Sequence, residues 1–270
     1  GEIYGLVGES GSGKSTVARC VMNIYKPSGG EIFYKGIPVC KNREFQKNRK
    51  MLQMTRQIIF QDSASSLNPG MKVRDIVEEP LRIQSRKIRT DKREIEKQLE
   101  LVGLDGSYLE KYPYELSGGQ RQRVAIARTL FAKPDLIVAD EPIASLDVSI
   151  QAQVVNLMKK MQKETGAAYL FIAHDLSMVK YISDKIGVLH LGHLVETGTT
   201  EEIFDNPIHP YTKSLLSAIP HPNPIVEKNR VAITYDKEKE GVDYTKGVQH
   251  KLTDTHIVLA TDEEFARWAK

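Results

Sequence analysis

The chain has 270 residues, of which 40% are hydrophobic and 27% charged, so it accommodates one large domain, alone or with appendages, and is neither disordered nor fibrous. The formal net charge of +3 is too small to argue for a nucleic-acid-binding protein, and apolar runs such as Ala167–Ala173 are far shorter than the roughly 20 residues that cross a bilayer. Only two cysteines, Cys20 and Cys40, exclude a disulfide framework or a four-thiolate iron–sulfur site within one chain and fit a reduced, cytosolic setting.

The first hundred residues begin with a strand, a glycine-rich loop and a helix, and then become helical. Residues 73–104 have apolar positions at three- and four-residue steps, and Asp91 with Glu94 forms a capping pair, so we predict a helical insert there. Two basic runs, starting at Lys41 and Arg82, are interpreted as solvated surfaces. The other elements expected here are a strand at 3–7, a helix at 14–22, and strands within 28–36 and 56–62.

Strands and helices alternate again from residue 135. We expect strands at 135–140 and 167–174, helices at 148–166 and 175–183, and a hairpin about Gly192 within 185–198. This alternation predicts an α/β fold with a mostly parallel core sheet and right-handed crossovers. From Pro207 onward prolines and then charges accumulate, which predicts a C-terminal extension rather than more sheet. Because the chain starts inside a strand, without a methionine, we expect its natural N-terminus to lie upstream.

The stretch "GESGSGKST", residues 8–16, fits the phosphate-loop pattern G-x-x-x-x-G-K-[ST] between a strand and a helix. Its glycines let backbone N–H groups surround a phosphate, Lys14 supplies a positive charge, and the Ser15 hydroxyl is a ligand for Mg²⁺. The alternative is a chance glycine-rich turn. The predicted nucleotide-binding residues of this loop are Gly8, Glu9, Ser10, Gly11, Ser12, Gly13, Lys14, Ser15 and Thr16.

Acidic and amide side chains follow two of the expected strands. "LIVADE" ends in Asp140, a predicted Mg²⁺ ligand, and Glu141, predicted to polarise the attacking water; the alternative is a solvated turn. Gln61, directly after "IIF", is predicted to hydrogen-bond both the metal and this water. The predicted metal ligands are therefore Ser15, Gln61 and Asp140.

Three further polar positions have two readings each. His174, which ends "YLFIAH", either touches the γ-phosphate or is an ordinary strand-end histidine. Asp147 either contributes to nucleotide binding or caps the next helix. His190 and His193 are expected in turns without the partners that a metal site requires, and we assign them no metal. The predicted catalytic residues are Glu141, His174 and Gln61.

The stretch "ELSGGQRQRVAIAR", residues 115–128, raises the question of a second phosphate. A serine and two glycines open a helix here, and a helix start of this kind binds an anion, although a phosphate loop is already present at Gly8–Ser15. The residues predicted at this helix start are Ser117, Gly118 and Gly119.

Taken in this order, the phosphate loop, Gln61, "LSGGQ", "LIVADE", "SLD" and His174 resemble the nucleotide-binding subunits of ATP-binding-cassette (ABC) transporters over roughly residues 1–220. The resemblance implies the P-loop NTPase fold of that family, with ATP and Mg²⁺ as cofactors. It also implies that two subunits pack head to tail, so that Ser117, Gly118 and Gly119 of one chain contact the γ-phosphate held by the Lys14 loop of the other. Gln120 and Asp147 join the nucleotide-binding set on the same grounds.

Finer motifs resemble one branch of the family. "FQDSASSLNP" is similar to peptide importers, "NPIHPYTKSLLSAIP" to the C-terminal element of the oligopeptide and dipeptide uptake group, and "LTDTHIVLATDEEFARW" to its F-type subunits. The resemblance implies an ATP-hydrolysing subunit of an oligopeptide importer. Its expected place is the cytoplasmic face of the membrane, as a peripheral protein paired with a D-type ATP-binding subunit in a heterodimer. Two transmembrane permeases and an extracellular peptide-binding protein complete the expected assembly.

Alternatives remain at this stage. Dipeptide and nickel importers share the C-terminal element, and a cassette ATPase acting on nucleic acid or ribosomes is a further reading, although the chain has neither a long coiled coil nor a second cassette. We expect no nucleic-acid partner. The expected division is a cassette domain at 1–206, with a helical subdomain at about 63–130, and an importer-type extension at 207–270.

Overall fold

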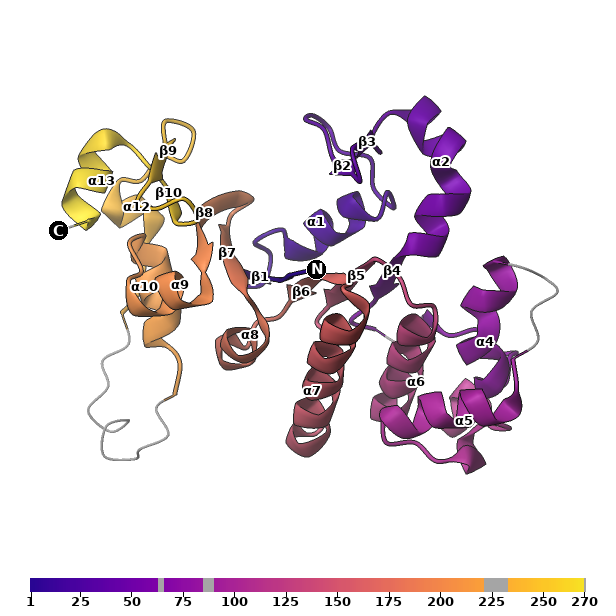
Figure 1. Cartoon of the computed structure of the whole chain (residues 1–270). Helices are drawn as coiled ribbons and strands as arrows, with labels where there is room; N and C mark the ends of the chain where they lie inside the picture. The colour runs from indigo at the N-terminus through magenta and orange to yellow at the C-terminus, as the bar shows by residue number, and fades with distance from the viewer. Residues whose placement is uncertain (63–65, 85–89, 221–232, 270) are drawn as a thin grey trace. The chain divides into compact units, whose positions relative to one another are not determined.

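The computed structural model describes residues 1–62, 66–84, 90–220 and 233–269 (Figure 1). The chain divides into two compact units. The first unit comprises Gly1–Glu2 and Ser15–Ile172, and the second comprises Ile3–Lys14 and Ala173–Lys270. None of the helices in the described part combines the length and the hydrophobicity of a membrane span.

Three parallel strands form the centre of the first unit. Strand β5 (Leu136–Asp140) pairs with β4 (Arg56–Ile59) on one side and with β6 (Ala168–Ile172) on the other. Residues 137–140 are buried, as expected of a parallel strand covered on both faces. Helix α7 (Val148–Thr165) connects β5 to β6 and ends at Gly166, whose φ of 69° is left-handed. The strands and the glycine stop predicted from the sequence are confirmed.

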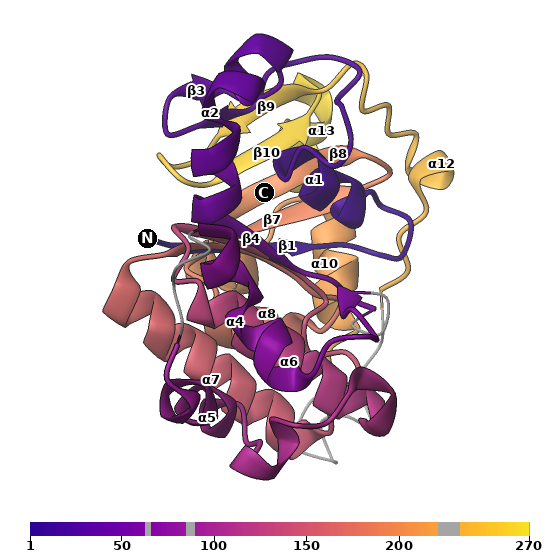
Figure 2. The same cartoon turned by 90° about the vertical axis from the view of Figure 1, so that its right-hand side faces the viewer.

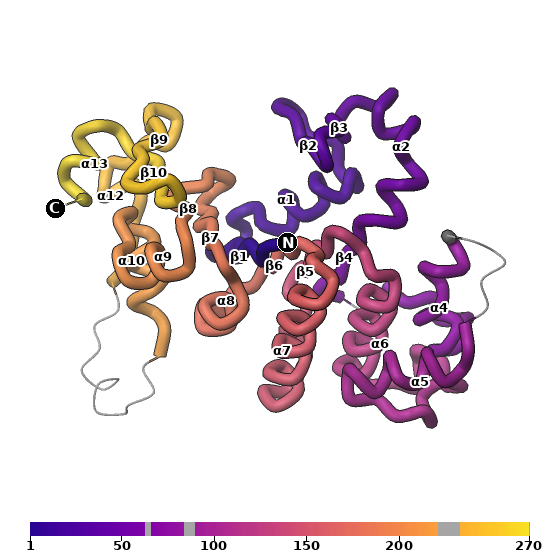
Figure 3. Tube along the Cα trace, in the orientation of Figure 1, coloured from indigo at the N-terminus to yellow at the C-terminus, as the bar shows by residue number. Residues whose placement is uncertain are grey.

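The helices expected within residues 73–104 are also confirmed. Helices α4 (Val73–Gln84), α5 (Lys92–Leu101) and α6 (Gly118–Phe131) pack together (Figure 3). Two short 3₁₀ turns, Gly106–Tyr108 and Pro113–Glu115, lie between α5 and α6. Asp91 is the N-cap of α5, as predicted. Its carboxylate accepts from the Arg93 amide at 3.0 Å, and Glu94 is not the partner of this cap. Residues 63–65 and 85–89 of the expected helical region lie outside the described residues.

The remaining elements of the first unit precede β4 in the chain. They are α1 (Lys14–Val21), β2 (Phe33–Tyr34), β3 (Ile37–Pro38) and α2 (Asn42–Thr55). The basic run that starts at Lys41 is mostly exposed, as predicted, but it belongs to α2, a helix that we did not predict. Only Leu52 of this helix is buried.

Strands of the second unit carry the phosphate loop. Strand β1 (Ile3–Val7) runs parallel to β7 (Lys185–His190), which pairs antiparallel with β8 (His193–Thr199). The connection between β7 and β8 is Leu191–Gly192, with φ values of 46° and 82°. Two consecutive left-handed residues produce the tight turn of a hairpin, so the predicted hairpin is confirmed.

The C-terminal extension adds strands, and the prediction that it would not is wrong. Strand β10 (Ile257–Ala260) pairs antiparallel with β8, and β9 (Val248–Lys251) pairs with β10 (Figure 2). Val258 and Ala260 are buried, because this short apolar run covers the outer edge of β8. This strand was not predicted because charged residues surround the apolar run in the C-terminal segment. The helices of this unit are α8 (Leu176–Ile182), α9 (Thr200–Asp205), α10 (Pro210–Ser217), α12 (Lys237–Glu240) and α13 (Asp262–Trp268).

Candidate functional site

The loop after β1 has a backbone that requires glycine. Gly8, Gly11 and Gly13 have φ values of 150°, 81° and 106°. A Cβ at Gly8 would lie 2.1 Å from the carbonyl oxygen of Leu189, so a side chain is sterically excluded there. On the other side, the Gly192 amide donates to the Ser12 carbonyl at 2.9 Å, which ties the β7–β8 turn to the loop.

Lys14 lies inside this loop rather than on its outside. Its Nζ donates to the carbonyl oxygens of Gly8 and Glu9, both at 2.8 Å, and the residue is only 6% exposed. A buried ammonium held by backbone carbonyls fixes a positive charge at the curve of the loop. This arrangement suits the binding of an anion such as a phosphate.

Ser15 and Asp140 are in contact within the first unit. The Ser15 hydroxyl donates to Oδ1 of Asp140 at 3.0 Å, and Asp140, the last residue of β5, is 4% exposed. A hydroxyl and a carboxylate brought together supply the oxygen ligands that Mg²⁺ prefers. Two of the three predicted metal ligands therefore lie side by side and fit such an ion.

Gln61 and Glu141 form the second contact at this strand end. Gln61 Nε2 donates to Oε2 of Glu141 at 2.8 Å, and Glu141 directly follows Asp140. Glu141 has a φ of 47°, in the left-handed region that non-glycine residues seldom adopt, while its amide donates to the Ile172 carbonyl at 2.9 Å. Backbone strain of this kind is concentrated at functional sites.

The start of α6 is a capped helix terminus with an open end. Ser117 Oγ accepts from the Gln120 amide at 3.2 Å, and Gln120 Oε1 accepts from the Ser117 amide at 2.9 Å. Gln120 also donates to the Tyr108 hydroxyl at 3.0 Å, so its side chain is committed to its own chain. Among the described residues, the helix-start donors left by this capping box are the amides of Gly118 and Gly119.

Gln122 is a site residue that the sequence reading missed. It is fully buried, and its Nε2 donates to the carbonyls of Pro142 at 2.9 Å and Phe60 at 3.3 Å. These carbonyls belong to the neighbours of Glu141 and Gln61, so one side chain of α6 holds both segments. The only signal in the sequence was the position of this glutamine one helical turn after the "SGG" start.

Asp147 and His174 are placed by the ends of helices. The Asp147 carboxylate caps α7 by accepting from the Ile150 amide at 3.0 Å and from the Ser149 hydroxyl at 2.6 Å. The hydrogen bond from Ser149 and the one from Ile150 lower the pKa of Asp147 below its usual range. His174 belongs to the second unit, is exposed, and directly precedes Asp175, the N-cap of α8.

The expectation that His190 and His193 lie in turns is wrong. His190 ends β7 and His193 begins β8, and His190 Nδ1 lies 2.6 Å from the Tyr244 hydroxyl. Burial lowers the pKa of His190. Within residues 1–62, 66–84, 90–220 and 233–269, no three histidine, cysteine or acidic side chains gather as a metal-ion site.

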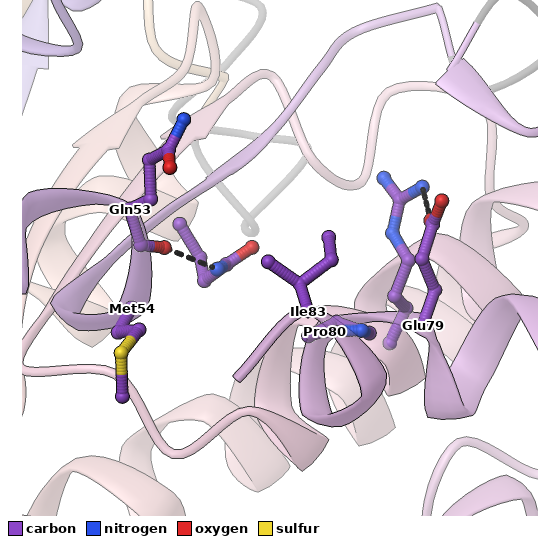
Figure 4. A pocket seen from close by; sticks show the side chains of 7 residues that line it. Gln53, Met54, Glu79, Pro80 and Ile83 are labelled. Atoms are coloured by element: carbon purple, nitrogen blue, oxygen red, sulfur yellow. Dashed lines mark hydrogen bonds and ion pairs between the residues drawn. The ribbon is translucent and has the colours of Figure 1, made fainter. Parts of the chain in front are cut away.

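A small groove lies between α2 and the helical insert, within the first unit. Figure 4 shows Pro80 and Ile83 of α4 in its middle, with Gln53 and Met54 of α2 on one side and Glu79 on the other. Its volume of about 230 Å³ is below the usual range for a small-molecule pocket, and Ile83 is 66% exposed. Its lining is mixed, with the apolar Met54, Pro80 and Ile83 beside polar and charged side chains.

Two family models match this sequence. The model described as "ABC transporter" matches residues 1–144, and the model described as "Oligopeptide/dipeptide transporter, C-terminal region" matches residues 195–241. The second match begins within β8 and includes α9, α10 and α12.

Similar proteins and structures agree with these matches. The chain is 52% identical to the oligopeptide transport ATP-binding protein OppF of Streptococcus mutans, over 100% of this chain and 87% of that protein. It is 51% identical to the dipeptide transport ATP-binding protein DppF of Lactococcus lactis, over 98% and 85%. The ATP-binding cassette MJ0796, solved as a dimer in a post-hydrolysis state bound to ADP and Pi, matches with a TM-score of 0.68 and 29% identity, over 74% of this chain and 85% of that one.

Proposed function

Because this chain belongs to the ABC transporter family and is an ATPase subunit of that fold, we propose that it energises the import of oligopeptides. The observation that supports oligopeptides as the cargo is the match of residues 195–241 to the oligopeptide/dipeptide C-terminal model. The names of the similar proteins support the same class. The 51% identity to a dipeptide transport protein makes dipeptides the second candidate cargo.

In this proposal, the phosphate loop and Lys14 bind the nucleotide. The backbone of residues 8–16 surrounds the phosphates, and Lys14, already held at the curve of the loop, supplies the positive charge. Ser15 and Asp140 hold Mg²⁺, which neutralises charge on the phosphate oxygens when bound. Gln61 is the third proposed metal contact.

Hydrolysis is assigned to the strand end that carries Glu141. Glu141 accepts a proton from the attacking water, and the Gln61 amide orients the carboxylate through their 2.8 Å hydrogen bond. His174 is proposed to contact the γ-phosphate, as the family resemblance implies. Asp147, which caps α7, is kept as a nucleotide-site residue on the same basis.

The open start of α6 supports a site shared between two chains. The Ser117 hydroxyl and the Gly118 and Gly119 amides are proposed to complete the nucleotide site of a second subunit, because a helix N-terminus favours an anion. The dimeric state named for the similar cassette supports such pairing. We propose a D-type subunit as the partner, so that the ATPase is a heterodimer. Within this chain, we propose a cassette domain at 1–206, with a helical subdomain at about 63–130, and an extension at 207–270.

The similarity to importer ATP-binding proteins supports membrane permeases as partners of this subunit. We propose that two of them bind it at the cytoplasmic face, with an extracellular peptide-binding protein supplying cargo. The groove lined by Met54, Pro80 and Ile83 is the proposed contact for one permease, because an exposed apolar side chain lines it. Gln61 and the helical insert would then transmit closure of the dimer to the permeases.

Lys14→Ala tests the nucleotide-binding assignment. We expect the dissociation constant for ATP to rise about 30-fold or more, since a hydrogen bond to a charged group contributes about 2 kcal/mol. Fluorescent-nucleotide titration of the full chain measures it. Lys213→Ala is the matched control, because Lys213 Nζ donates to the Trp268 carbonyl in the same unit. Unchanged affinity in Lys14→Ala, with the fold intact, would contradict the role of the loop.

Gln122→Leu tests the buried link between Gln61 and Glu141. The change leaves the carbonyls of Phe60 and Pro142 without this donor, so we expect about a tenfold lower ATP turnover with nucleotide affinity within about twofold, for a loss of roughly 1–3 kcal/mol of local stabilisation. Phosphate release by the assembled complex and nucleotide titration separate the two effects. Gln98→Leu is the control, since Gln98 is also buried in the insert and donates to the Ala127 carbonyl. Equal turnover in wild type and Gln122→Leu would refute the link.

A further inference from the structure

The C-terminal segment reaches the phosphate loop through one side chain. The Glu9 amide donates to the Tyr211 hydroxyl at 2.9 Å, although the two residues are 202 positions apart. Tyr211 lies on α10 and is 1% exposed. Glu9 is the second residue of the loop, and its carbonyl accepts from Lys14. The Tyr211 hydroxyl therefore binds the amide of Glu9, and the carbonyl of the same residue binds Lys14.

We propose that Tyr211 is a positioning residue for the phosphate loop, through which the oligopeptide/dipeptide C-terminal segment sets the nucleotide affinity of this subunit. The inference rests on the proposed function, in which the loop binds ATP. It assigns residues 207–220 a task inside the nucleotide site, in addition to any contact that they make with a partner.

Aromatic side chains hold the Tyr211 ring in place. The His190 ring lies 4.1 Å from it and the Tyr235 ring 5.6 Å, measured between ring centroids. His190 in turn lies against Tyr244, with Nδ1 2.6 Å from its hydroxyl. Burial raises the pKa of Tyr211 to about 12, so its hydroxyl remains neutral at physiological pH. The oxygen that meets Glu9 is therefore fixed in position and in protonation state.

A buried carboxylate fixes the start of α10. Glu196 of β8 is 1% exposed, and its oxygens accept from the amides of Ile208 at 2.8 Å and His209 at 3.0 Å. The same carboxylate contacts His256 Nε2 at 2.8 Å. Pro210, the next residue, is the first of α10, so Glu196 sets where the helix begins and hence where Tyr211 points.

The expected effect follows from pre-organisation. A loop that already has its binding conformation loses little conformational freedom when an anion binds. Without the Tyr211 hydroxyl, the Glu9 amide loses its partner and the loop populates other conformations, so the apparent affinity falls by the fraction that remains competent. Once nucleotide is bound, the loop is ordered in both cases, and the catalytic step at Glu141 proceeds as before.

Tyr211→Phe in the full chain tests this inference, because it removes one oxygen and keeps the ring. We expect the dissociation constant for a fluorescent ATP analogue to rise about five- to tenfold, while kcat at saturating ATP stays within about twofold. Hydrogen exchange at the Glu9 amide should accelerate without nucleotide. Tyr235→Phe is the matched control, because its hydroxyl contacts that of Tyr244 and its ring belongs to the same set.

Glu196→Gln provides a second, independent measurement. We expect it to weaken nucleotide binding, and we expect the double variant Glu196→Gln, Tyr211→Phe to bind no more weakly than Tyr211→Phe, because Glu196 acts through Tyr211. Wild-type affinity and wild-type exchange in Tyr211→Phe would overturn the inference, as would an equal loss in Tyr235→Phe. If the wild-type chain itself bound no ATP, the proposed function would fail instead.

Discussion

Glu141→Gln should retain nucleotide binding and lower the rate of ATP hydrolysis by about a thousandfold, within the 10²- to 10⁴-fold range typical of a lost general base. The amide cannot accept a proton from water, but it keeps the shape of the carboxylate and an oxygen for Gln61 Nε2. Because ATP then persists between two subunits, we expect a stable dimer in its presence. Phosphate release by the assembled complex and size-exclusion chromatography with ATP measure these effects.

The matched control for this change is Glu110→Gln. Glu110 is an exposed glutamate of the same unit that pairs with Lys72 and Arg74, so its neutralisation alters surface charge without touching the strand end. We expect wild-type turnover from it. Wild-type turnover in Glu141→Gln would instead remove Glu141 from the mechanism.

Ser117→Arg should leave nucleotide binding by its own chain unchanged. It should lower the rate of hydrolysis at the site shared with its partner by about 100-fold or more. The serine is exposed at the start of α6, where an arginine places bulk over the Gly118 and Gly119 amides. Loss of one oxyanion-type donor alone costs about 10²- to 10³-fold in turnover. Radiolabelled ATP and a heterodimer with one altered chain allow each site to be measured separately.

Ser117→Ala separates the two consequences of that change. It removes the N-cap, which costs about 1 kcal/mol of helix stability, without adding bulk or charge. Thermal unfolding should therefore shift similarly in both variants. Hydrolysis at the partner's site should fall further in Ser117→Arg than in Ser117→Ala, because the alanine removes only the hydroxyl, whereas the arginine also covers the Gly118 and Gly119 amides. If Ser117→Arg lost its own ATP and left the partner's site working, the assignment across the interface would be wrong.

Local pattern was sufficient to predict most of the central strands and the phosphate loop. Residues 136–140 form an unbroken apolar run that ends in an acid, and this run is buried in the parallel arrangement that it indicated. The glycines of the loop were also a sufficient signal, because the positive φ values and the close approach of Leu189 require glycine at these positions.

Contacts between distant segments were beyond the reach of such patterns. Gln122 holds carbonyls 62 and 20 residues away, and Tyr211 meets an amide 202 residues away, so the sequence around each side chain does not show which segment it contacts. The left-handed backbone of Glu141 is likewise imposed by tertiary packing, since no propensity favours it. The apolar run at Ile257–Ala260 is present in the sequence, but the composition of the segment around it is charged, and we therefore predicted no strand there.

The pairing of β10 with β8 bears on how this protein can be dissected. A strand edge with unpaired N–H and C=O groups is a template for association with other chains, and β10 occupies that edge of β8. The strand that is outermost instead, β9, is short and carries Gln249, His250 and Lys251, which discourage further pairing. A chain cut before residue 248 would keep its phosphate loop but leave that edge of β8 unpaired, so we expect such a fragment to associate with other chains, and a fragment that remains monomeric has to include β9 and β10.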